Sequence, residues 1–175
     1  MGFFLSTSHT VINTITYAVV YSMNISFAGC GFQGMYHLGA VSCLQRHGKG
    51  LLKGAKCFGG ASAGSLVAAV LATSTPLEKG VQFTVDLAVE VRKHFLGALS
   101  PSFDLMQYLE GGLNNILPEN SHEQASGKLH VSLSSYPHCE NVIVSQFASK
   151  NELIQVQYSV ILRYNYSITC AQAIL

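Results

Sequence analysis

The sequence is poor in charge, and this excludes some common classes of function. Charged side chains make up 11% of the 175 residues, and the formal net charge at pH 7 is +1. A usual soluble domain has about a quarter charged residues. The scattered, nearly balanced charges argue against electrostatic capture of nucleic acid. The shortage of charge predicts either a large buried fraction or apolar surface that meets lipid or a partner.

Cysteine patterns and long apolar runs are also missing. The five cysteines form no C-x-x-C pair and show no regular spacing, which argues against a disulfide framework and a zinc site, so no metal is predicted. Residues 1–22 are apolar but interrupted by polar side chains, and they lack a basic start. Neither a signal peptide nor a spanning helix is therefore predicted. We expect an intracellular protein with peripheral membrane contact.

Strand patterns alternate with helix patterns along the chain. Short apolar runs predict strands at 24–28, 56–59, 129–133 and 141–147, and apolar periodicity predicts helices at 35–47, 63–73, 77–95 and 104–116. Capping-box spacing marks two further helix starts, at Ser121 and Ser149. The alternation predicts an α/β fold with a sheet covered by helices on both faces.

The segment Gly60-Ala-Ser-Ala-Gly64 matches G-x-S-x-G between a predicted strand and a predicted helix, which is the context of a nucleophile elbow. Such a turn holds the serine in strained dihedrals, and side chains at positions 60 and 64 would collide with flanking backbone. Ser62 would also lie at a helix N-terminus, where free N–H groups favour negative charge. The alternative is a small-residue turn in which Ser62 is only an N-cap.

A second glycine motif, Gly29-Cys-Gly-Phe-Gln-Gly34, follows the first predicted strand and fits G-x-G-x-x-G. A dinucleotide-binding loop needs an acidic residue about 20 positions further on, but none occurs between Asn24 and Leu77. The other use of such a loop is an anion nest. Its N–H groups, with that of Ala63, would hold the oxyanion of an ester-cleavage intermediate.

These two motifs carry a resemblance to a known family. The stretches Ile25–Gly39 and Gly59–Leu66 closely resemble patatin-like phospholipases, and within them the animal subgroup of adipose triglyceride lipase and adiponutrin. The likeness covers about residues 24–156 and continues through four further stretches: Arg92–Gly97, Ser121–Glu123, Ser126–Leu129 and Glu140–Ser145.

The resemblance implies a three-layer α/β/α fold and hydrolysis of long-chain acylglycerol or phospholipid esters in lipid catabolism. It implies a lipid substrate at a lipid-droplet or membrane surface, an activator protein as a further partner, and no cofactor. It assigns the nucleophile to Ser62 and the elbow glycines to Gly60 and Gly64. The implied oxyanion hole consists of Gly29, Gly31, Phe32, Gly34 and Ala63.

The family's catalytic base has no counterpart in the sequence. In such enzymes it is an aspartate followed by glycine, but neither aspartate here, Asp86 or Asp104, precedes a glycine. Asp86 is expected on the polar face of a helix and Asp104 at a helix start. His37 is expected to be a packed or hydrogen-bonded helix residue, because nothing places a histidine within about 3 Å of the serine. Cys30 and Cys57 lack a base partner.

The likeness ends after Val156, and three regions are predicted. They are an atypical N-terminal extension (1–22), a partial patatin-like lipid hydrolase domain (23–156) and a divergent C-terminal tail (157–175) of a truncated product. The leading hypothesis is a serine-dependent lipid acyl hydrolase. The alternative is a catalytically incomplete protein that interacts with a lipid-droplet or membrane surface.

Overall fold

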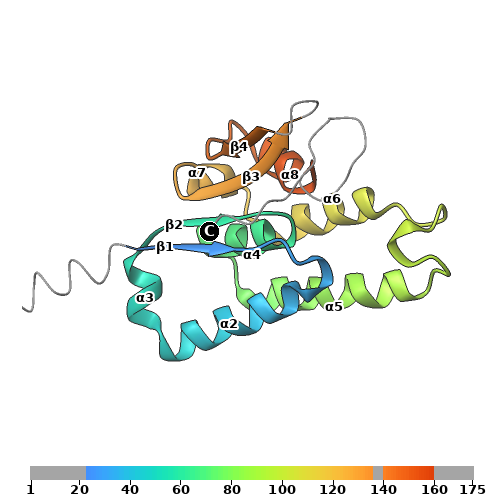
Figure 1. Ribbon diagram of the computed structural model, residues 1–175, viewed down its shortest axis with the longest axis horizontal. Helices are drawn as coiled ribbons and strands as arrows, with labels where there is room; N and C mark the ends of the chain where they lie inside the picture. The colour runs from blue at the N-terminus through green and yellow to red at the C-terminus, as the bar shows by residue number, and fades with distance from the viewer. Residues whose placement is uncertain (1–22, 136–139, 160–175) are drawn as a thin grey trace, which may run out of the picture.

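The computed structural model describes residues 23–135 and 140–159, so the predictions for 1–22 and for most of the C-terminal tail lie outside the described residues. Strands and helices alternate through the described part (Figure 1). The strands are β1 (Met23–Phe27), β2 (Ala55–Gly60), β3 (Leu129–Ser135) and β4 (Glu140–Val144). The α-helices are α2 (Gly34–His47), α3 (Lys49–Gly54), α4 (Ala63–Ala72), α5 (Leu77–Arg92), α6 (Leu105–Ile116), α7 (Ser121–Ala125) and α8 (Lys150–Ser159). Two 3₁₀ turns are η1 (Gly31–Gln33) and η2 (Gly97–Leu99).

The four strands form one sheet in the order β1-β2-β3-β4. The pairs β1–β2 and β2–β3 are parallel, and β4 runs antiparallel to β3. Parallel neighbours need crossover connections, which α2 with α3 and α4 to α7 provide. Phe27 at the end of β1 pairs with Gly60 at the end of β2, so both glycine motifs begin at the same edge of the sheet. This mixed α/β architecture, with helices flanking the sheet, confirms the predicted fold class.

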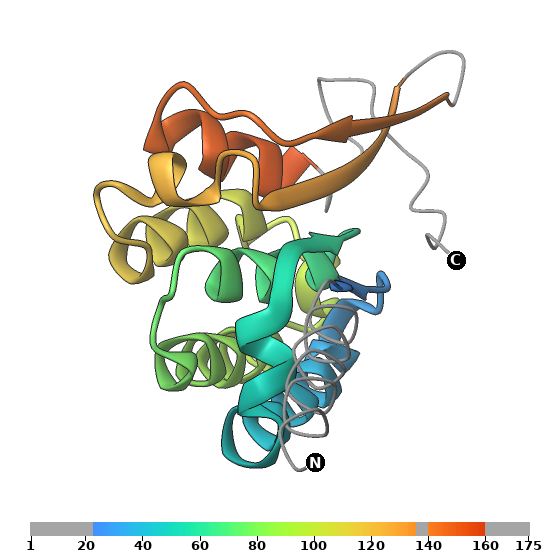
Figure 2. The ribbon, with the colours of Figure 1, turned by 90° about the vertical axis from the view of Figure 1, so that its left-hand side faces the viewer.

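Helix α4 lies at the centre of the packing. It contacts β1, β2 and β3 on one side and α2 and α5 on the other, and Figure 2 shows it between α5 and the group formed by β3, β4, α7 and α8. Its sequence is almost wholly small and apolar, so it can be buried nearly all round. On β1, by contrast, Asn24 and Ser26 are exposed, so that face of the strand meets solvent.

Local signals predicted most element types, and four details differ. Strand β4 ends at Val144, short of the predicted end at Phe147. Helix α5 ends at Arg92, short of Phe95, because the N–H groups of Lys93 and His94 donate to carbonyls only three residues back and tighten the chain into a turn. The short helix α3 was not predicted, because six residues carry too little periodicity. The capping box expected at Ser121 is wrong: Asn120 is the N-cap and makes no side-chain cap. At Ser149 the capping bond is present, since its hydroxyl accepts from the Glu152 N–H at 3.1 Å.

Candidate active site

Strand β2 enters α4 through a tight turn at Ser62. This residue has φ 52° and ψ −133° and makes no side-chain capping bond, so it is not a side-chain N-cap. Its dihedrals lie in a region that L-residues rarely adopt. A Cβ at Gly60 would lie 2.5 Å from the backbone of Gly64 and Ser65. A Cβ at Gly64 would overlap the carbonyl oxygen of Phe27. The collisions predicted from the sequence are therefore present at both glycines.

The carbonyl group of Ser62 is held by Ser65. The N–H and the hydroxyl of Ser65 lie 2.8 and 2.7 Å from the Ser62 carbonyl oxygen. The Ser65 hydroxyl also lies 2.8 Å from the side-chain amide of Gln157 in α8, and both residues are fully buried. A hydroxyl has one proton, so an amide orientation in which Gln157 Nε2 donates to Ser65 satisfies both contacts. Gln157 thus links α8 to the turn, although sequence reasoning had placed it in the divergent tail.

The second glycine motif forms η1 between β1 and α2. Gly31 has φ +53°, a conformation that favours glycine. The Gln33 N–H donates to the Cys30 carbonyl at 3.0 Å, and the Gly34 N–H donates to the Gly31 carbonyl. The N–H groups at the very start of η1 belong to Gly31 and Phe32. First-turn N–H groups have no intrahelical acceptor. The N–H groups of Gly31 and Phe32 are therefore not used within the turn, whereas those of Gln33 and Gly34 are.

The start of α4 shows the same distinction. The Gly64 N–H donates to the Ala61 carbonyl at 3.0 Å, and the Ser65 N–H donates to Ser62. Ala63 is the first residue of the helix, so its N–H is one that helix geometry leaves without an intrahelical acceptor. Of the predicted oxyanion-hole residues, Gly31, Phe32 and Ala63 therefore have N–H groups at helix starts, whereas the N–H of Gly34 is used within its own turn.

Both turns open onto one cavity of about 140 Å³. Its wall contains five of the predicted site residues: Gly31, Phe32, Gly34, Ser62 and Ala63. The rest of the lining comes from α2, α4, α5 and α6 and the residue after α6, and it consists of Leu38, Leu66, Val67, Ala69, Val70, Gly80, Phe83, Thr84, Leu87, Leu105, Leu109, Leu113, Ile116 and Leu117. Gly29 is exposed and outside this lining. Such a volume corresponds to roughly five water molecules, and because most of the lining is apolar it suits part of an apolar chain.

No titratable side chain of the described residues lines this cavity. The His37 Nε2 atom lies 3.1 Å from the Ala28 carbonyl oxygen, which agrees with the predicted packed helix residue. Asp104 is the N-cap of α6, as expected of a helix-start carboxylate, and accepts two backbone N–H bonds. Asp86 accepts from Gln82 on the exposed side of α5. Asp86, Asp104 and His37 all lie outside the cavity lining. None of the three is therefore assigned as a base for Ser62.

The two thiols near the sheet are no better suited to act as nucleophiles. Burial raises the pKa of the Cys30 thiol, which lowers its thiolate fraction at neutral pH. The Cys57 thiol faces the carbonyl oxygen of Gly127 at 3.8 Å.

No group of three metal-binding side chains occurs within residues 23–135 and 140–159. In the same ranges, no helix is long and apolar enough to cross a membrane.

The chain belongs to the patatin-like phospholipase family, which it matches over residues 25–161. It is 50% identical over 135 residues to human patatin-like phospholipase domain-containing protein 4, covering 77% of this chain and 53% of that protein. It is 48% identical over 132 residues to mouse patatin-like phospholipase domain-containing protein 2, covering 75% of this chain and 27% of that protein. It is 42% identical over 131 residues to mouse 1-acylglycerol-3-phosphate O-acyltransferase Pnpla3, covering 75% and 32%. No solved structure matches the chain.

The family match confirms the resemblance read from the two glycine motifs. The chain spans about half the length of the first of these relatives and a third or less of the other two. These relatives are named as patatin-like phospholipase domain-containing proteins and as an acyltransferase.

Proposed function

We propose that this chain carries the nucleophile half of a serine lipid acyl hydrolase, of the triacylglycerol lipase or phospholipase type, that cleaves long-chain acyl esters. The observation that supports it is the apolar cavity whose wall contains Ser62 and the turn of Gly31 and Phe32. An acyl chain in this cavity would bring its ester group to the one wall that has hydroxyl and backbone N–H groups together.

The chemistry would be nucleophilic catalysis. The Ser62 oxygen attacks the ester carbonyl carbon, its proton passes to a base, and the carbonyl electrons move onto oxygen. The N–H groups of Gly31, Phe32 and Ala63 are proposed as the oxyanion donors, and Gly34 as a shaping residue. Loss of one such donor costs about a hundredfold to a thousandfold in rate. The alcohol then leaves, and water releases the fatty acid from the acyl-enzyme.

None of the described side chains that line the cavity is titratable, so no base for Ser62 is assigned among them. This observation favours a second candidate function, a catalytically incomplete protein that interacts with a lipid-droplet or membrane surface. General-base assistance is worth about a hundredfold to ten-thousandfold, so a chain without a base would be slow. Both candidates place the protein in the cytoplasm at a lipid-droplet or membrane surface, with an activator protein as a partner of the hydrolase.

The test is release of fatty acid from emulsified long-chain acylglycerol by the purified chain and its Ser62→Ala variant. We expect Ser62→Ala to lower release by at least about a thousandfold. Ser74→Ala is a matched control, because Ser74 also has φ 52° but lies beyond the C-terminal end of α4, outside the cavity lining.

Three outcomes separate the candidates. Release that Ser62→Ala abolishes and Ser74→Ala preserves supports the hydrolase. Equal release from the chain and from Ser62→Ala contradicts the nucleophile assignment. A folded chain that releases no fatty acid supports the catalytically incomplete alternative.

A further inference from the structure

The connection between α5 and α6 presents large apolar side chains to solvent. We call residues 92–103 the tip. Within it Phe95 is 100% exposed, Leu99 84% and Leu96 56%. Clustered exposed apolar side chains mark interaction sites more often than scattered single ones do. The tip is therefore a candidate interaction surface.

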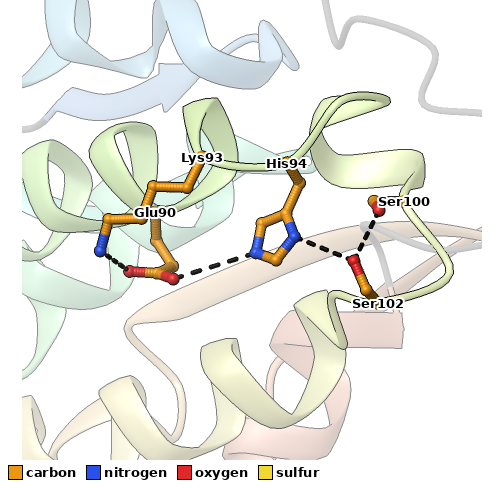
Figure 3. A network of polar contacts seen from close by, with 5 residues as sticks. All are labelled: Glu90, Lys93, His94, Ser100 and Ser102. Carbon is orange, nitrogen blue, oxygen red and sulfur yellow. Dashed lines mark hydrogen bonds and ion pairs between the residues drawn. The ribbon is translucent and has the colours of Figure 1, made fainter.

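The tip has a hydrogen-bonded framework of its own (Figure 3). His94 Nδ1 lies 3.0 Å from the Ser102 hydroxyl, which lies 2.9 Å from the Ser100 hydroxyl. The Gly97 N–H donates to the His94 carbonyl at 2.9 Å, and the ring centroids of His94 and Phe103 lie 5.0 Å apart. These contacts all join residues of the tip. The exposed apolar side chains therefore extend from a turn that is held together by hydrogen bonds.

The charges of the tip are of one sign. It contains Arg92 and Lys93, and no acidic residue occurs from 92 to 103. The flanking Asp104 caps α6, and Glu90 pairs with Lys93 at 2.7 Å and offsets its charge, so the net positive charge of the tip comes from Arg92. The Lys93 side chain is still 61% exposed in that pair. Cations beside exposed aromatic and leucine side chains are the combination that binds anionic lipid surfaces.

The tip also lies next to the candidate active site. Leu87 before it and Leu105 after it both line the cavity. Figure 1 shows the α5–α6 connection toward the same end of the molecule as the loop between β1 and α2. In that loop Phe32 is 49% exposed, and in the first turn of α2 Tyr36 is 80% exposed. A lipid surface that received the tip would therefore meet the end of the protein where the cavity begins.

We propose that the tip docks this protein on a lipid surface that contains anionic phospholipid. Phe95, Leu96 and Leu99 enter the acyl region, and Arg92 and Lys93 lie at the level of the headgroups. The proposal rests on the proposed function for its lipid substrate, and it names the segment that brings the cavity to that substrate. Docking in this way shortens the path of an acyl chain from the surface into the cavity.

The main experiment measures binding of the full chain to vesicles of phosphatidylcholine with phosphatidylserine, in a Ser62→Ala background so that turnover plays no part. The double variant Phe95→Ser/Leu99→Ser should weaken binding by at least about tenfold, because two side chains no longer enter the lipid. Its matched control is Val142→Ser/Ile143→Ser on β4, which removes two exposed apolar side chains elsewhere and should leave binding unchanged.

Two further variants test depth and charge. The chain contains no tryptophan, so Phe95→Trp provides a single tryptophan whose emission can be excited selectively. Its emission should shift to the blue on vesicles and be quenched by brominated acyl chains, whereas Ile143→Trp should show neither effect. Arg92→Gln should weaken binding by roughly fivefold, and only when phosphatidylserine is present, while Lys53→Gln on α3 should not.

Several results would overturn the proposal. They are no vesicle binding by the folded chain, equal losses in the tip variant and the β4 control, or no quenching at position 95. A dimer in solution that the tip variant abolishes, with vesicle binding intact, would assign the tip to a second copy instead. Because binding is measured without turnover, a chain that binds through the tip but releases no fatty acid contradicts only the hydrolase.

Discussion

The two glycine motifs look alike in sequence and occupy equivalent places, each after a parallel strand and before a helix, yet their glycines are needed for different reasons. At the elbow, Gly60 and Gly64 are demanded by close backbone, since a Cβ at either would strike main-chain atoms. At the loop, a Cβ on Gly31 would meet nothing within 4 Å, and the requirement is its φ of +53°. Close packing thus requires glycine at the elbow, whereas a left-handed backbone conformation requires it at the loop.

The difference has a consequence for the site. Collisions with backbone cannot be relieved by moving a flexible side chain, so the elbow has a single arrangement that holds Ser62 in its unusual dihedrals. The loop is exposed and less crowded, so its N–H groups are placed by a local turn. Substitutions at the two motifs should therefore differ in size.

The largest effect is expected from Gly64→Ala. The new methyl group would overlap the carbonyl oxygens of Phe27 and Ala28, so β1 and α4 would have to separate. We expect the free energy of unfolding to fall by about 4 kcal/mol or more, measured by urea denaturation. Gly39→Ala in α2 is the control, because its Cβ would lie in open space and alanine favours a helix by about 1 kcal/mol. A loss below about 1 kcal/mol for Gly64→Ala would contradict the steric explanation.

An intermediate effect is expected from Gly31→Ala. Alanine pays roughly 1–2 kcal/mol for a left-handed conformation, and no clash adds to it. Gly31→Asn should cost less, because asparagine tolerates that region. The free energies of unfolding of the two variants give the comparison. Equal losses for alanine and asparagine would show that φ is not the cause.

The smallest effect is expected from Gly34→Ala. Gly34 is right-handed helical, and its Cβ would lie 3.5 Å from that of Ala63, an ordinary contact. The helix propensity of alanine should keep the free energy of unfolding equal or raise it by up to about 1 kcal/mol. A clear destabilisation, measured in the same urea titration, would mean that the wall between the two turns is tighter than this contact indicates.

The alternation of strands and helices and the two turns can be predicted from the sequence, because both depend on residues close together in the chain. The elbow collisions follow from β2 meeting α4 within a few residues, and Asp104 was expected at a helix start for a similarly local reason. Gln157 could not be predicted, because its partner Ser65 lies 92 positions away. Its only signal was its helical spacing, three and four residues after the buried Ile154 and Leu153.

The sequence by itself determined the family, the class of fold and the position of the candidate nucleophile, since motif spacing and local sterics are written in short segments. The tertiary structure alone decided which N–H groups lie at helix starts beside the cavity and which are used within their turns. It alone assembled the cavity, because α2, α4, α5 and α6 reach one another only through crossover connections. Which apolar side chains are buried and which remain exposed at the tip is likewise a result of packing between distant elements.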